Sequence, residues 1–183
     1  MVLSDPLVAL LDEARAGEEG AARARERWLR RQAEEGATLV GALLDLAERG
    51  SPVSIRTGSG RSSTGLVLAL GTDFLVLRAA GRGDVCVRLG AISSIRPQGG
   101  ERHRPPTGGR PAPLDLLLVE VLAGLAPDRP RVALWTGGVG LVTGELLAVG
   151  GDVVTVGLEG TPHALCYVAA AAVEEAVLAA EPG

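Results

Sequence analysis

Lysine is absent from this sequence, and aromatic residues are rare. All 18 cationic side chains are arginine, and aromatic residues make up 2% of the 183 positions. Large rings usually supply much of the surface buried in a core, so we expect cores built from leucine, valine, isoleucine and alanine. The heavy use of alanine, glycine, valine and arginine is typical of a GC-rich genome and predicts a bacterial source.

Cysteine and histidine are too few and too scattered for a covalent or metal-bound scaffold. The chain has Cys86, Cys166, His103 and His163, without paired spacing, which excludes a disulfide framework and any familiar zinc site. No run approaches the roughly 18 apolar residues of a membrane span, and no basic region precedes an apolar run at the N-terminus. We therefore expect a protein of the reducing cytoplasm with no membrane partner.

Catalytic patterns are missing as well. The sequence shows no paired carboxylates, no nucleophile with an adjacent base and no cluster of metal ligands. The glycine-rich segments 58–60 and 137–140 are not followed by Lys and Ser or Thr, which excludes a phosphate-binding loop. The sequence predicts a protein that is not an enzyme, with no catalytic residue, cofactor, metal or small-molecule substrate.

The chain does contain an internal repeat. When the sequence is aligned with itself so that Val53 lies on Val132, the segment Val53–Gly81 matches Val132–Gly160 without a gap, and ten of the 29 positions are identical. About three identities would be expected by chance in a chain of this composition. The repeat predicts one structural unit that occurs twice.

Periodicity within each copy predicts a helix followed by five short strands. A helical apolar stripe covers about residues 22–49, and its part before residue 36 is an extra N-terminal helical segment. The expected fold class is therefore mainly β with helices (α+β), as two tandem five-stranded small barrels each preceded by a helix. The expected boundaries are 1–35 for the N-terminal segment, 36–97 for the first barrel, 98–111 for a Gly/Pro/Arg-rich linker, and 112–178 for the second barrel. The expected strands are 53–56, 65–70, 74–78, 85–89 and 92–96, then, after a helix at 114–125, 131–135, 141–149, 153–158, 164–168 and 172–177.

Two motifs give these copies a family resemblance. The pattern G-x-[VL]-L-A-x-G-x-D-x-[LV] occurs at Gly65–Leu75 and at Gly144–Val154, and V-C-V-R-L-G-A-I-S-S-I occupies Val85–Ile95. Together with the order of elements, they resemble the Sm-like (LSm) fold over most of each predicted barrel. PRC-barrel and KOW-type domains have similar SH3-like strand patterns and stay open as alternatives.

The resemblance implies an assembly and a ligand. It implies a ring or ring-like assembly in which the fourth strand of one barrel pairs with the fifth strand of its neighbour. It also implies RNA sites built from Gly71–Phe74 and Arg88–Ile92. The chain departs from the family pattern, because Val76 lies where the family usually has asparagine and the second bend, Ala169–Ala172, has no polar side chain. A nucleic-acid site is therefore expected only in the first copy.

Charge and size also predict association. Residues 51–110 carry nine arginines and three acids, whereas residues 111–183 carry two arginines and nine acids. Net charges of +6 and −7 favour pairing of the first copy with the second, within a chain or between chains. A unit of about 60 residues is marginally stable alone, and the edge strands of a small open barrel must be covered. We therefore expect self-association through edge strands.

These features predict a non-catalytic assembly or protein-interaction module of unknown pathway. The alternative is an RNA- or DNA-binding regulator that uses the basic first copy, with one ring to stack on bases. A solvated face, or a face that meets the acidic second copy, explains the same arginines. An apolar stripe in the N-terminal helix predicts docking of a partner through Trp28 and Leu29. The candidate nucleic-acid residues are Arg56, Arg61, Phe74, Arg78, Arg82 and Arg88.

Overall fold

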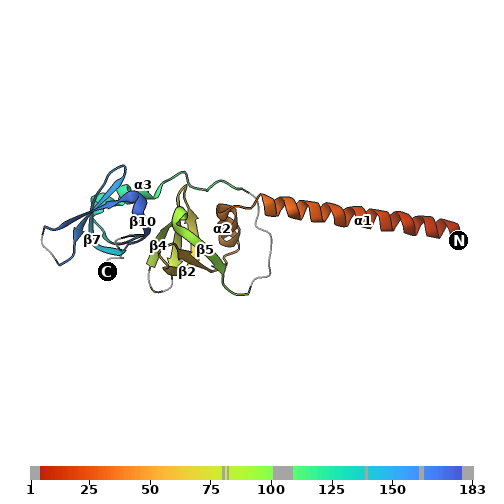
Figure 1. The fold of residues 1–183 in the computed structure, drawn as a ribbon, viewed down its shortest axis with the longest axis horizontal. Coiled ribbons are helices and arrows are strands. Elements are labelled where there is room, and N and C mark those ends of the chain that lie inside the picture. Colours follow the sequence, from red (N-terminus) through yellow and green to blue (C-terminus); the bar gives the residue numbers. More distant parts are fainter. Residues whose placement is uncertain are drawn as a thin grey trace. The chain divides into compact units, whose positions relative to one another are not determined.

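The computed structural model describes residues 5–79, 81, 83–100, 109–138, 140–160 and 163–178 (Figure 1). The chain divides into two compact units, which are described separately. The first unit is Met1–Ala42 with His103–Arg110, and the second is Leu43–Arg102 with Pro111–Gly183. The expected domain boundaries within the chain stay predictions.

Two helices replace the single helix expected over residues 22–49. Helix α1 runs from Asp5 to Glu35, and α2 runs from Leu39 to Glu48. The interruption follows from local chemistry, since Gly36 has a low helix propensity and the Thr38 hydroxyl accepts a hydrogen bond from the Gly41 amide at 3.0 Å. A threonine in that position starts a new helix. Among the described residues, no helix is long and apolar enough to cross a membrane.

Each half of the second unit supplies five strands, close to the predicted ranges. In the first half these are β1 (Val53–Thr57), β2 (Ser62–Leu70), β3 (Phe74–Ala79), β4 (Gly83–Arg88) and β5 (Ile92–Pro97), with the short helix η1 (Leu89–Ala91) before β5. The second half begins with α3 (Leu118–Leu125) and η2 (Ala126–Asp128). It continues with β6 (Arg131–Thr136), β7 (Gly140–Val149), β8 (Val153–Leu158), β9 (Leu165–Ala169), η3 (Ala170–Ala172) and β10 (Val173–Leu178).

The ten strands form one open antiparallel sheet, so the prediction of two separate five-stranded barrels is wrong. The strand order is β5-β1-β2-β3-β4-β10-β6-β7-β8-β9. Strand β4 of the first half pairs with β10 of the second. The hydrophobic core also joins the halves, because Phe74 and Cys86 belong to the same cluster as Leu134 and Ala176. An edge strand needs a neighbour, and the sequence of β4 does not specify which half supplies it.

The two halves nevertheless repeat each other in detail. Both have the strand order fifth, first, second, third, fourth. The register shifts at Val67/Ala69 between β2 and β3, and at Leu146/Ala148 between β7 and β8, which are equivalent positions of the repeat. Matching turn hydrogen bonds join Gly71 N to Phe74 O and Gly150 N to Val153 O, both at 2.8 Å.

Two glycines of the repeated motif are required by close backbone contact. A Cβ atom added to Gly65 would lie 2.1 Å from the carbonyl oxygen of Arg78, and one added to Gly144 would lie 2.0 Å from that of Gly157. No side chain fits at such distances without movement of the neighbouring strand. The motif therefore reflects strand packing at these positions.

Candidate functional site

The junction between β4 and β10 holds the two halves together. The paired residues are Val85 with Val177, Cys86 with Ala176, and Val87 with Glu175. Cys86 and Ala176 are buried, at 5% and 0% exposed. The junction therefore combines a backbone ladder with an apolar contact.

Arg88 connects the end of β4 to the second half. Its guanidinium donates hydrogen bonds from Nε to the carbonyl of Val173 at 2.9 Å and from Nη2 to the carbonyl of Ala170 at 2.8 Å. Its Nη1 donates to the Asp73 carboxylate. Because the Arg88 side chain is only 19% exposed, its charge depends on these acceptors rather than on water.

Asp73 connects the same point to α3. One oxygen of its carboxylate accepts from Arg88, and the other accepts from the backbone N–H of Leu118 at 2.7 Å. Leu118 is the first residue of α3, so the carboxylate satisfies an otherwise unpaired helix N–H. Asp73 and Arg88 thus place the end of β4, the start of α3 and the η3 turn together.

A second polar cluster surrounds Glu175. Its side chain is 1% exposed, and its Oε2 accepts from Arg61 Nε at 3.1 Å and from Ser63 Oγ at 3.3 Å. The Arg61 guanidinium carbon lies 3.8 Å from the centroid of the Trp135 ring. The other carboxylate oxygen, Oε1, is buried and has no hydrogen-bond partner among the described residues. The negative charge of Glu175 is therefore paired with Arg61, which belongs to the other half of the chain.

The charge asymmetry of the sequence is partly explained by these contacts. Arg61 from the basic half meets Glu175 from the acidic half, and Ser59 donates a hydrogen bond to Glu174 in the same region. These two contacts join the halves within one chain.

The predicted nucleic-acid residues do not form one surface in the described part of the chain. Phe74 is 2% exposed and packs in the core that contains Leu118 and Leu122. Arg61 and Arg88 bind carboxylates and carbonyls, most of them in the second half. Nucleic-acid binding through the first half stays a prediction.

The remaining candidate arginines differ in their surroundings. Arg78 pairs with Asp84 at 3.0 Å, and the hydrogen bond and charge of Asp84 raise the pKa of Arg78. Arg56 is exposed on β1. Arg82 lies outside the described residues, as do Arg102, Arg104 and His103 of the linker. Trp28 and Leu29 lie on α1 and are 56% and 53% exposed.

The ends of the sheet were expected to be contact edges, but the exposed tyrosine at one of them was not among the predicted site residues. Among the described residues, β5 and β9 each have one neighbouring strand. In the repeat alignment Val76 corresponds to Thr155. Val76 pairs with Cys86 on β4, and Thr155 pairs with Tyr167 on β9. Cys86 and Tyr167 are therefore equivalent positions of the two halves. Cys86 is buried, whereas Tyr167 is 69% exposed. The signal in the sequence was the single tyrosine in an alternating strand.

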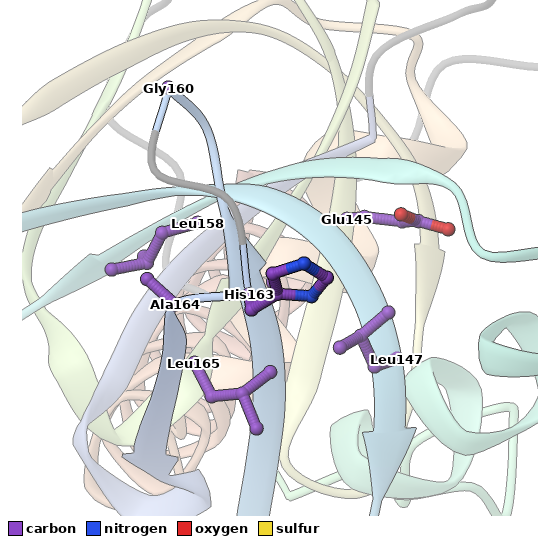
Figure 2. A pocket seen from close by; sticks show the side chains of 8 residues that line it. Glu145, Leu147, Leu158, Gly160, His163, Ala164 and Leu165 are labelled. Atoms are coloured by element: carbon purple, nitrogen blue, oxygen red, sulfur yellow. The ribbon is translucent and has the colours of Figure 1, made fainter.

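A hollow of about 560 Å³ lies beside this edge (Figure 2). His163 and Leu165 line it together with Glu145 and Leu147. The Glu145 carboxylate is turned away from the imidazole (Figure 2), and its Oε1 lies 3.9 Å from Arg129 Nη1. The histidine and the carboxylate therefore do not form an acid–base pair.

Cys86 is buried, and the described acids and cysteines do not gather into a metal-binding group. Burial, with a smaller contribution from the charge of Asp84, raises the pKa of Cys86 from 9.0 to about 11. A thiol with such a pKa is a poor nucleophile at neutral pH, because the thiolate is the reactive form. The described residues include no group of three or more His, Cys, Asp or Glu side chains placed to hold a metal ion.

No protein-family model matches the chain, and no curated protein matches it. The resemblance to Sm-like, PRC-barrel and KOW-type domains therefore stays a prediction from the motifs.

Proposed function

We propose that the protein is a non-catalytic assembly module whose copies join head to tail through β9 of one chain and β5 of the next. The observation that carries this proposal is the pairing of β4 with β10 inside the chain. This pair joins a fourth strand to a fifth strand. The strands left at the ends of the sheet, β9 and β5, are again a fourth and a fifth strand.

The internal junction supplies the register for the external one. Cys86 in the first half corresponds to Tyr167 in the second. Ala176 pairs with Leu134, and Ile95 pairs with Ile55, which is the repeat equivalent of Leu134. Ala176 therefore corresponds to Ile95. Tyr167 of one copy would therefore lie opposite Ile95 of the next copy, as Cys86 lies opposite Ala176. Such a contact joins two different surfaces, so its repetition closes a ring or continues as a filament.

The external contact is expected to be weaker than the internal one. Arg88 pairs with Phe74, and Ala169 pairs with Val153, the repeat equivalent of Phe74. Ala169 therefore takes the place of Arg88 at the external contact. Alanine offers no side-chain donor for the carbonyls that Arg88 binds at the internal junction. Copies should therefore separate on dilution before the sheet unfolds.

The proposal is tested by the mass of the full chain as a function of concentration. Tyr167→Lys places a charge on the edge, where it opposes strand addition, without changing a buried position. We expect the wild-type mass to rise at micromolar concentration in sedimentation velocity, and Tyr167→Lys to weaken this association at least about tenfold.

Leu141→Lys is the matched control, since Leu141 is 51% exposed but lies on β7, between β6 and β8. It should associate like the wild type. A wild-type chain that stays monomeric, or an equal effect of the two lysine variants, would contradict edge pairing.

A further inference from the structure

Helix α1 has a described surface that is almost entirely exposed to solvent. The helix is 31 residues long, and among its described side chains only Ala33 is half-buried. Its large apolar side chains include Leu10, at 64% exposed, and Trp28, at 56%. Helices in water gain most of their stability from packing of an apolar face, so α1 is expected to have a packing partner.

Six small or apolar residues of α1 follow a heptad spacing that is symmetric about Glu19. They recur at alternating intervals of four and three residues, which is the spacing of a coiled-coil seam. When two copies of α1 run antiparallel and cross at Glu19, Leu10 lies opposite Trp28 of the second copy. At the centre small residues lie opposite one another and allow close approach. The seam consists of Leu10, Ala14, Gly17, Ala21, Ala24 and Trp28.

The charges on α1 favour the antiparallel direction. Residues 5–19 carry five acids and one arginine, a net of −4, and residues 20–35 carry five arginines and three acids, a net of +2. The helix dipole does not explain this distribution, because its effect is confined to the terminal turns and the last turn of α1 has no basic residue. An antiparallel pair places each acidic half against a basic half.

Individual pairs agree with the overall charge. In the antiparallel pair, Leu10 faces Trp28 of the second copy and Ala14 faces Ala24, and each such facing pair is a layer of the seam. Glu13 of one copy and Arg27 of the other both lie beside these two layers. A parallel pair would instead place Glu13 beside Glu18 of the second copy. Near the crossing point Glu18 of one copy lies opposite Glu18 of the other. This is the like-charge contact of the antiparallel seam. Two Glu13–Arg27 pairs outnumber it.

We propose that α1 is a dimerisation helix that binds α1 of a second copy of this chain in an antiparallel pair, with Leu10 against Trp28 at each end. This contact is independent of the sheet edges. Copies that use both surfaces would form branched or cross-linked assemblies, and copies that use α1 alone would form dimers.

The test uses the full chain with Tyr167→Lys, so that edge pairing is blocked and the two proposals can fail separately. Sedimentation equilibrium should give a dimer in this background. Adding Trp28→Glu should weaken the dimer at least about tenfold, because an aromatic anchor is replaced by a charge. Ala22→Glu is the matched control, since it adds the same charge to the same half of α1 outside the seam, and it should leave the dimer intact.

The direction of the helices is tested by oxidation of single-cysteine chains in a Cys86→Ala, Cys166→Ser background. Mixing Ala14→Cys chains with Ala24→Cys chains should give the mixed disulfide, because the two positions share a layer. The Ala14→Cys chain alone should stay reduced, since its two copies lie about ten residues, or about 15 Å, apart. A disulfide between two Ala14→Cys chains, a monomer, or equal effects of Trp28→Glu and Ala22→Glu would each overturn the proposal.

Discussion

Replacing Arg88 with alanine is expected to lower the free energy of unfolding by about 4.5 kcal/mol, because three hydrogen bonds from a charged donor at roughly 1.5 kcal/mol each are lost. Two of their acceptors are carbonyls of the second half, at Val173 and Ala170. The third is the Asp73 carboxylate, which also holds the first N–H of α3. Urea unfolding followed by circular dichroism measures the change.

The loss should be local as well as global. Hydrogen exchange in Arg88→Ala should increase first at β4, β10 and the start of α3, since these are the elements that Arg88 joins. Arg56→Ala is the control, because Arg56 is exposed on β1, and it should change stability by less than about 0.5 kcal/mol. Equal effects of the two substitutions would show that Arg88 does not hold the halves together.

Replacing Arg61 with alanine is expected to cost about 3 kcal/mol, the range found when one partner of a buried ion pair is removed. Glu175, which is 1% exposed, would keep only the Ser63 hydroxyl at 3.3 Å for its Oε2. The contact of the guanidinium with the Trp135 ring would also be lost. The free energy of unfolding in urea again gives the result.

A second substitution separates charge from packing. In Arg61→Ala with Glu175→Gln, the buried group is neutral, so about half or more of the lost stability should return. Arg131→Ala serves as the control ion pair, because Arg131 and Glu159 are 70% and 46% exposed, and it should cost no more than about 1 kcal/mol. If Glu175→Gln deepens the loss instead, the uncompensated carboxylate is not its cause.

Much of the local structure followed from the sequence, because strand alternation and turn residues are local signals. The strand β8 begins and ends at the predicted residues, and β3 differs by one residue at its end. The break between α1 and α2 did not follow, since the apolar stripe continues through Gly36 and only the cap at Thr38 divides it.

The arrangement of the strands could not be predicted in the same way. The sequence pattern of β4 indicates a strand that needs a neighbour, but the pattern is the same whichever strand pairs with it. In the structure Arg88 at the end of β4 donates hydrogen bonds to the carbonyls of Val173 and Ala170, which are distant from it in the sequence. The two-barrel prediction failed at this point.

The candidate site was predicted unevenly for a related reason. Arg61 and Arg88 were predicted to contact nucleic acid. Charge alone, however, does not distinguish a ligand-binding arginine from one that binds a distant part of its own chain. Phe74 was predicted to stack on bases because it lies among the arginines of the first copy, in the segment that the Sm-like resemblance makes an RNA site. In the structure that position lies in the core that contains Leu118 and Leu122 of α3, and a contact between halves of this kind leaves no local pattern.

The single ten-stranded sheet is tested most directly by nuclear Overhauser contacts between backbone protons of β4 and β10. Contacts should join Cys86 to Ala176 and Val87 to Glu175, the pairs seen in the sheet. In a mixture of labelled and unlabelled chains, isotope filtering should show these contacts to be within one chain. Contacts from β4 to β5 of its own half, with none to β10, would contradict the continuous sheet.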